Sequence, residues 1–238
     1  MTTLHSGAAF ALVLFLAAAP AHAQEAERPD FTGVWELASP PMTRTNQYPD
    51  LPFTEEGLTH IEAHRALVDP RGENPGMYCV IAGMPEMMMA AGGYPMEVIQ
   101  KPDQVTLISE NENDIRRLYL GDRIVPDSDI FPSRNGYSKA RWEGDVLVVE
   151  TAHLEEQPDS RFPHSAATTI DERFSLTEED GEPRLVIETV VTDPEWLTEP
   201  LEYTLEYRPY DIGWIMPYTC TVQAWLDHLD ELAAEAGQ

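Results

Sequence analysis

The second half of the chain alternates apolar and polar side chains with a period of two residues. The clearest example is residues 201–208, where Leu and Tyr occupy every second position and Glu, Thr and Arg lie between them. Neighbouring side chains of a β-strand point to opposite faces, so this pattern predicts a strand that buries one face. A sheet with one buried and one solvated face is typical of antiparallel β-structure.

Similar runs recur along the chain, separated by turn signals such as Lys101-Pro102-Asp103 and Glu143-Gly144-Asp145. The predicted strands are residues 31–37, 96–101, 104–110, 114–120, 138–143, 146–153, 167–176, 184–192 and 200–208, with a further candidate at 214–220. Sheets with this many strands usually curl and close, which leaves no unpaired edge. We therefore expect an all-β fold, an antiparallel up-and-down β-barrel of about eight to ten strands.

Two helices are expected beside the barrel. Thr54-Glu55-Glu56 begins a short helix before the strands, and Asp69-Pro70 ends it. Apolar residues recur at helical spacing in residues 221–236, which predicts a C-terminal helix. We find no internal repeat and no second domain, so residues 24–238 are expected to form one unit. Its parts are residues 24–95 with the first strand, a loop and the short helix, residues 96–220 with the β-meander, and the closing helix.

The first 23 residues have the features of a signal peptide. Residues 8–20 form an apolar run, and Ala21-His22-Ala23 matches an A-x-A cleavage site. The segment before the run has no Lys or Arg, so an uncleaved N-terminal anchor is the alternative. We expect a periplasmic or secreted protein with no membrane span after cleavage. Such a location permits a disulfide between Cys79 and Cys220, the only two cysteines, and two buried free thiols are the alternative.

The charge of the chain excludes several classes of partner. With 42 Asp and Glu against 15 Lys and Arg, the net charge is −27, which repels nucleic acid and anionic membranes. The sequence contains no P-loop and no dinucleotide fingerprint, so we expect no nucleotide cofactor, nor any other cofactor. The expected partner is a small hydrophobic or amphipathic molecule, because an eight-stranded barrel leaves room for one small ligand.

Gly33-Val34-Trp35 resembles the G-x-W strand with which lipocalins and other calycins begin their barrel. That resemblance implies a calycin-like barrel in which an Arg near the last strand packs over the Trp, and Arg208 is the candidate. The chain also resembles a widespread group of secreted, largely uncharacterised bacterial proteins, most distinctively in residues 141–151 (RWEGDVLVVET). This second resemblance implies a secreted β-barrel and no particular activity. Tyr137 stands where that group usually has His.

Three residues are candidates for acid–base catalysis: His164, His153 and Tyr137. His164 precedes Ser165 at a strand entrance, and a His there can move protons near neutral pH. No G-x-S-x-G motif surrounds Ser165, which speaks against a hydrolase triad. A hydrogen-bonded histidine at the barrel rim is the alternative interpretation of His164.

Arginines in the strand segments are candidates for ligand binding. Arg116, Arg117, Arg141 or Arg173, if inward, would face Glu150 or Glu188 and bind an acidic ligand, whereas outward positions would give surface ion pairs. Tyr residues, among them Tyr119, offer aromatic walls for a pocket. The predicted ligand-binding residues are Arg117, Tyr119, Arg141, Glu150, Arg173 and Met84.

Two further patterns suggest metals but have plainer interpretations. Six of the nine Met residues lie between positions 77 and 96, where they either bind Cu(I) or pack as a plug over the barrel. His60 and His64 are spaced i, i+4 with no third ligand fixed by the sequence, so a solvated helix face is favoured and no metal site is predicted.

Three functions follow, in order of preference. The first is a barrel that binds a small apolar or amphipathic molecule in its cavity. The second is a cofactor-independent isomerase or lyase that uses His, Tyr and Arg in that cavity. The third is copper binding by the Met-rich loop.

Overall fold

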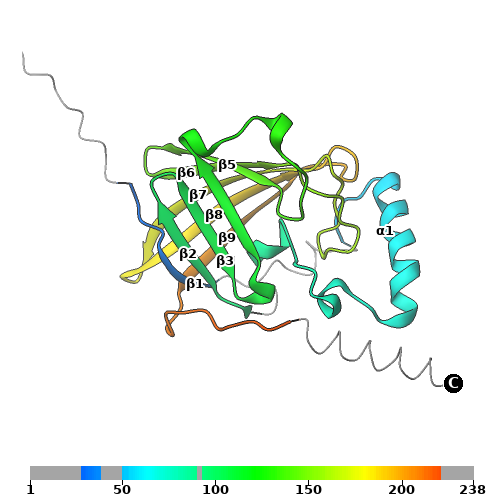
Figure 1. Cartoon of the computed structure of the whole chain (residues 1–238), viewed down its shortest axis with the longest axis horizontal. Helices are drawn as coiled ribbons and strands as arrows, with labels where there is room; N and C mark the ends of the chain where they lie inside the picture. The colour runs from blue at the N-terminus through cyan, green and yellow to red at the C-terminus, as the bar shows by residue number, and fades with distance from the viewer. Residues whose placement is uncertain (1–27, 39–49, 90–92, 221–238) are drawn as a thin grey trace, which may run out of the picture.

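In the computed structural model, residues 28–38, 50–89 and 93–220 are described, and within them nine strands close into a barrel (Figure 1). The strands are β1 Gly33–Leu37, β2 Met96–Lys101, β3 Gln104–Ser109, β4 Ile115–Leu120, β5 Tyr137–Glu143, β6 Val146–Ala152, β7 Thr169–Glu179, β8 Glu182–Thr192 and β9 Leu201–Pro209. They neighbour one another in chain order, and β9 pairs with β1 to complete the circle. The all-β barrel expected from the alternation is confirmed, and it is compatible with a calycin-like fold.

The β4–β5 pair departs from the expected antiparallel pattern. These two strands run parallel, with Leu118 opposite Ser138, whereas the other neighbouring strands are antiparallel. Parallel neighbours need a crossover rather than a tight turn. Residues 121–136 supply that crossover, and most of them are exposed. Residues 214–220, a candidate strand in the sequence, form no strand.

Apolar side chains of a Met-rich turn fill the space inside the barrel. A short 3-10 helix, η4 (Glu86–Met89), buries Met87, Met88 and Met89 among the inward Leu, Val and Ile side chains of the strands, and Met84 is also fully buried. The Tyr207 hydroxyl on β9 donates a hydrogen bond to the Met88 carbonyl. Burial of such side chains contributes about 1.5–3 kcal/mol each. The Met cluster therefore forms a plug that is part of the core.

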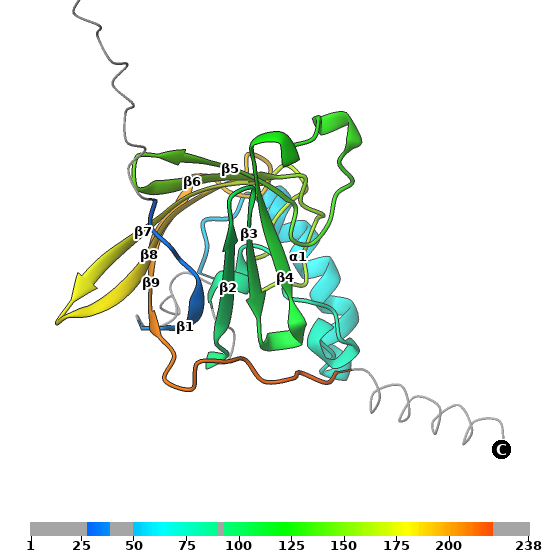
Figure 2. The same ribbon diagram turned by 60° about the vertical axis from the view of Figure 1, so that its left-hand side comes forward.

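Helix α1 (Glu55–Val68) lies beside the barrel, as both views show (Figures 1 and 2). Thr54 caps it by accepting a hydrogen bond from the Gly57 N–H, and Ile61 is its buried apolar side chain. Gly57 packs so closely on Trp196 that a Cβ there would lie 2.8 Å from the Trp196 Cβ. In Figure 2 the β7–β8 hairpin extends away from the barrel on the side opposite to α1. No helix among these residues is long and apolar enough to cross a bilayer.

A disulfide joins Cys79 to Cys220. Cys79 directly follows the 3-10 helix η3 (Pro75–Tyr78), and Cys220 lies at the end of the short segment after β9. The predicted pairing is therefore present, and the Cα–Cα distance is 5.6 Å. The predicted signal peptide and C-terminal helix lie outside the described residues.

Arg208 does not pack over Trp35. It lies opposite Glu36 in the register and donates to the Glu36 carboxylate at 2.8 Å, with half of its side chain exposed. Neighbouring residues of a strand face opposite sides, so Arg208 shares the outer face with Glu36. The buried Trp35 indole instead donates to the carbonyl of Phe31 at 2.9 Å.

Candidate functional site

Among the arginines whose side chains are described, Arg116 of β4 is the one that lies inside the barrel. Its guanidinium binds both carboxylate oxygens of Glu172 on β7, and it also donates to Ser138 on β5 at 3.1 Å and to Thr151 on β6 at 2.8 Å. All four side chains are buried. The ion pair and its hydrogen bonds therefore connect four strands of the barrel, β4, β5, β6 and β7. We therefore assign the Arg116–Glu172 pair a structural role in the barrel.

The alternation of apolar and polar residues indicates this ion pair, although the residue types alone do not. Glu172 lies between Ile170 and Phe174 in the apolar phase of β7, where an inward residue is expected. An inward carboxylate needs a cation, and Arg116 occupies the same phase of β4. The partner is therefore Glu172, and neither Glu150 nor Glu188 faces this arginine.

Three of the predicted ligand-binding residues, Arg141, Glu150 and Arg173, lie on the outer face of the barrel. Arg141 pairs with Glu150 and, at 3.1 Å, with Glu143, and Arg173 reaches Glu143 at 3.1 Å. Their side chains are about half exposed. Exposed pairs of this kind contribute about 0.2–1 kcal/mol each. Their role in ligand binding stays a prediction, but the structure does not bring them to an interior cavity.

His164 is buried next to the plug. Its Nδ1 lies 3.0 Å from the Ser165 carbonyl, and its Nε2 lies 3.0 Å from the Met84 carbonyl. A neutral imidazole donates through one nitrogen only, so the ring serves one of these carbonyls at a time. Burial lowers the pKa of His164 below its ordinary value, against the raising effect of the carbonyl contacts and of Asp193. The neutral ring can therefore donate either to the adjacent Ser165 carbonyl or across to the Met84 carbonyl beside the plug.

This environment predicts that acid destabilises the fold through His164. The unfolded chain protonates His164 near pH 6.5 and the folded protein only at lower pH, so the unfolded state binds more protons between these values. The free energy of unfolding should be unaffected by His164 above pH 6.5 and should fall as the pH drops below it. Urea unfolding of the wild type and of His164→Gln on both sides of pH 6.5 checks this, with the exposed His60→Gln as control. Identical pH profiles for all three would contradict it.

The other two predicted catalytic residues are separated from His164. His153 directly follows β6, and its Nε2 lies 3.7 Å from the Asp127 carboxylate. Tyr137 stacks on Tyr119 with 4.8 Å between ring centroids, and its hydroxyl accepts from the Val125 N–H at 3.1 Å and donates to the Arg123 carbonyl at 3.2 Å. The contacts of these side chains do not link them to one another in a catalytic group.

A cavity of about 430 Å³ lies among the loops beside the barrel. We call it the mouth cavity. It is lined by residues 74–76, 80–82, 111–112 and 159–161 and by Glu86, Tyr94 and Arg134. This volume lies in the range of small-molecule sites. One part of the wall is apolar, from Val80, Ile81 and Ala82, and another part carries charged groups.

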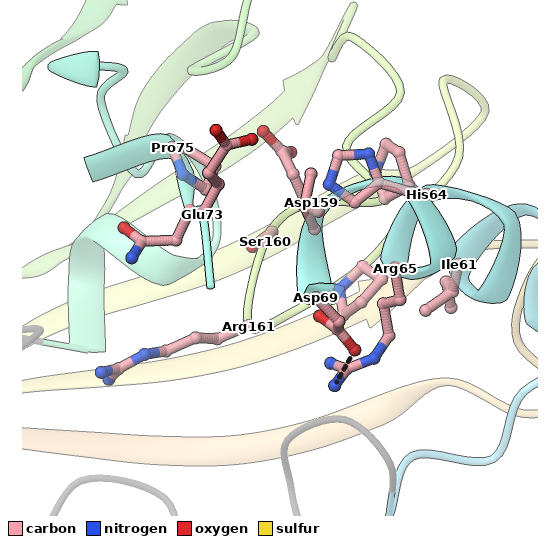
Figure 3. Close-up of a pocket in the computed structure, with 13 residues that line it drawn as sticks. Ile61, His64, Arg65, Asp69, Glu73, Pro75, Asp159, Ser160 and Arg161 are labelled. Atoms are coloured by element: carbon pink, nitrogen blue, oxygen red, sulfur yellow. Dashed lines mark ion pairs between the residues drawn. The ribbon is translucent and has the colours of Figure 1, made fainter. Parts of the chain in front are cut away.

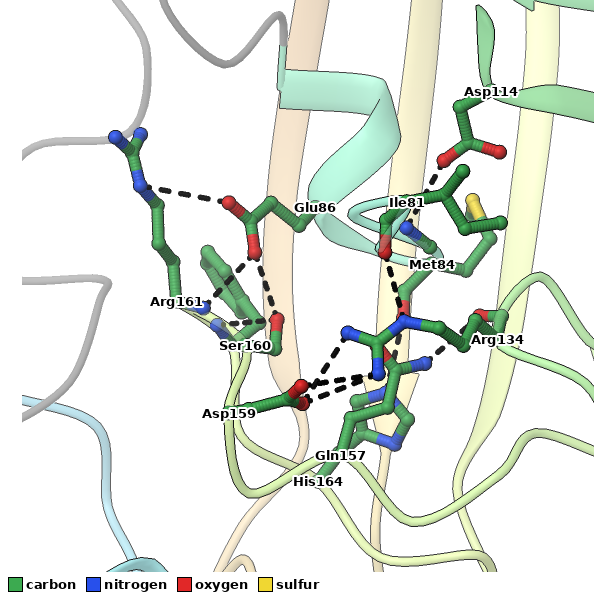
Figure 4. Close-up of polar contacts among 12 residues, drawn as sticks. Ile81, Met84, Glu86, Asp114, Arg134, Gln157, Asp159, Ser160, Arg161 and His164 are labelled. Carbon is green, nitrogen blue, oxygen red and sulfur yellow. Dashed lines mark hydrogen bonds and ion pairs between the residues drawn. The ribbon is translucent and has the colours of Figure 1, made fainter. Parts of the chain in front are cut away.

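Two charged pairs belong to the wall of the mouth cavity, and Figure 4 shows their contacts. Arg134 donates to both carboxylate oxygens of Asp159 at 3.2–3.3 Å and to the Ile81 carbonyl at 2.8 Å. Glu86 accepts from the Ser160 hydroxyl at 2.9 Å and from the Arg161 N–H at 3.0 Å. The Arg161 guanidinium is 3.5 Å from the Glu86 carboxylate, and its side chain is 58% exposed.

Glu112 is the charged residue of this wall that forms no ion pair with the described residues. Its Oε2 is buried and has no hydrogen-bond partner among the described residues, while the Ala82 N–H donates to the carboxylate. Burial, followed by the charges of Asp114 and Glu86, raises the pKa of Glu112. A buried acceptor without a donor is costly, so a ligand that donates a hydrogen bond there would be stabilised.

A second, smaller cavity of about 230 Å³ lies between α1 and residues 158–163 (Figure 3). It shares residues 74–75 and 159–161 with the mouth cavity. His64 lines it, whereas His60 contacts Glu156 and the Trp196 ring. The two histidines therefore have different surroundings, and no group of three or more potential metal ligands occurs in the described parts of the chain.

None of the residues that line the mouth cavity was among the predicted site residues. Met84, the predicted residue of the plug, is fully buried. The cavity is built from loops that have no periodicity, so pattern analysis assigns them no face. The available signal was local: Glu86 and Glu112 are acidic residues set among apolar or turn residues. Neither the models of known protein families nor the curated protein sequences contain a match to this chain.

Proposed function

We propose that this protein is a secreted or periplasmic barrel that binds a small amphipathic molecule in the mouth cavity. The observation that carries the proposal is a cavity of ligand size with an apolar wall and a buried Glu112 oxygen that has no donor in the described parts of the chain. The barrel interior is filled by the Met plug, which favours the mouth over the lumen as the binding place. The disulfide supports a location outside the cytoplasm.

The charges of the mouth cavity favour a ligand with a hydrogen-donating, preferably cationic, head. Asp159 is neutralised by Arg134 and Glu86 by its contacts with Ser160 and Arg161, which leaves Glu112 to receive the head. The net charge of −27 also attracts cations toward any acidic opening. A short alkyl chain would lie on Val80, Ile81 and Ala82. A primary amine with an alkyl tail is the simplest molecule that satisfies both requirements.

Glu112→Gln is expected to weaken the binding of octylamine about tenfold, because a charge-assisted hydrogen bond becomes a neutral one. Calorimetric titration of the wild type and the variant measures the two dissociation constants. Glu202→Gln, which removes an exposed carboxylate from the outside of β9, is the matched control and should bind as the wild type does. Octanoate has the same tail and an acidic head, so it should bind more weakly than octylamine.

The pH dependence gives a second readout of the same contact. Octylamine binding needs the ionised carboxylate of Glu112, and the pKa of Glu112 is raised. As the pH is lowered, the affinity should therefore begin to fall at a pH above 4.5, the ordinary pKa of a Glu. The Glu112→Gln variant should lack this decline. Equal affinities of octylamine for the wild type and for Glu112→Gln would contradict the proposal.

A further inference from the structure

A third cavity, of about 290 Å³, lies on the outer face of the barrel where β4 and β5 separate. Pairing between these strands begins at Leu118, so the start of β4 is not covered by β5. Residues 133–136 form the opposite wall, and Ile81 and Arg134 separate this space from the mouth cavity. We call it the seam cavity. It brings together three residues that the sequence singled out separately: Arg117, Tyr119 and Tyr137.

Arg117 is an exposed guanidinium without a partner among the described residues. Every other arginine whose side chain is described has an ion pair, a hydrogen bond or a ring contact. Because no carboxylate of the described residues pairs with Arg117, an anionic ligand there would not have to displace one of them. A guanidinium binds a carboxylate through two parallel hydrogen bonds.

The remaining walls of the seam cavity favour a flat ligand with a donor group. Tyr119 and Tyr137 are stacked with 18° between their rings, and the backbone contacts of the Tyr137 hydroxyl fix this pair as an aromatic wall. The Asn135 Nδ2 donates to Asp114 and to the Ile115 carbonyl. The Oδ1 of the same side chain is buried and has no hydrogen-bond partner among the described residues. Ile115 adds an apolar surface that is 39% exposed.

We propose that the seam cavity is a second binding site, which takes an aromatic carboxylate that also carries a hydrogen-bond donor. The carboxylate pairs with Arg117, the ring lies against the Tyr119–Tyr137 wall, and the donor satisfies Asn135 Oδ1. This site is independent of the mouth cavity and prefers ligands of the opposite charge. Octylamine titrations therefore test the mouth cavity alone, and either proposal can fail without the other.

The probe is 4-hydroxybenzoate, whose binding is followed by NMR titration of the wild type. Arg117→Gln is expected to weaken binding at least tenfold, because it removes the charged partner of the carboxylate. Arg208→Gln makes the same change of charge on the outer face of β9 and should change the dissociation constant by less than about twofold. Thermal unfolding of both variants verifies that they are folded.

Two related molecules separate the contacts. Benzoate lacks the donor for Asn135 and should bind several-fold more weakly than 4-hydroxybenzoate, and phenol lacks the carboxylate and should bind more weakly still. The largest shift changes are expected at the Asn135 side-chain amide and the Tyr119 ring. The proposal is overturned if 4-hydroxybenzoate does not bind, if it binds Arg117→Gln as tightly as the wild type, or if phenol binds equally well.

Discussion

Removing the Cys79–Cys220 bond is expected to lower the free energy of unfolding by up to about 5 kcal/mol, the largest effect we predict. The bond closes a loop with a sequence separation of 141 residues, and in the chain-entropy account a longer loop restricts the unfolded chain more. The Cys79→Ser/Cys220→Ser double variant avoids a free thiol. Urea unfolding of the oxidised wild type and of this variant measures the difference, and equal midpoints would contradict the prediction.

The disulfide also fixes one wall of the mouth cavity. Cys79 directly follows η3, whose residues Pro75 and Gly76 line that cavity. The double variant should therefore bind octylamine more weakly than the wild type even under conditions in which it is folded. Titration well below its unfolding temperature separates this local loosening from global unfolding.

Arg116→Met is expected to destabilise the fold by about 3–5 kcal/mol, because it leaves the Glu172 carboxylate buried without a cation. The Arg116→Met/Glu172→Met double variant replaces the whole pair by apolar side chains and should recover much of this loss. Ser138 and Thr151 can remain bonded to each other, since their hydroxyls are 2.8 Å apart. Urea unfolding of the single and double variants gives the coupling. A double variant no more stable than Arg116→Met would show that the carboxylate is not the source of the cost.

The strands were predictable because alternation with a period of two residues is visible wherever one face is buried. The predicted segment 104–110, for example, coincides with β3 to within one residue. The parallel β4–β5 pair was not predictable in the same way. Its direction depends on the crossover at residues 121–136, and a loop carries no periodic signal about where it leads.

The candidate sites show the same division. Arg117, Tyr119 and Tyr137 were chosen for their chemistry, and the structure brings them together because they share the outer face at the β4–β5 seam. Arg141 and Glu150 were equally suitable chemically, but register placed them in exposed pairs. The mouth cavity depends on contacts between distant loops, such as Glu86 with Ser160, which are 74 residues apart. The sequence pattern does not predict such contacts, because Glu86 and Ser160 do not belong to one helix or strand whose period would relate their positions.

The most direct test of the mouth cavity is to locate bound octylamine by NMR, using protein labelled at the methyl groups of Ile, Val and Met. We predict intermolecular contacts from the alkyl chain to the methyl groups of Val80 and Ile81 in the mouth wall. Contacts instead to Met84 and Met88 would place the ligand among the plug residues inside the barrel. That result would contradict the proposed binding place, because the ligand would have to displace the Met plug from the barrel interior.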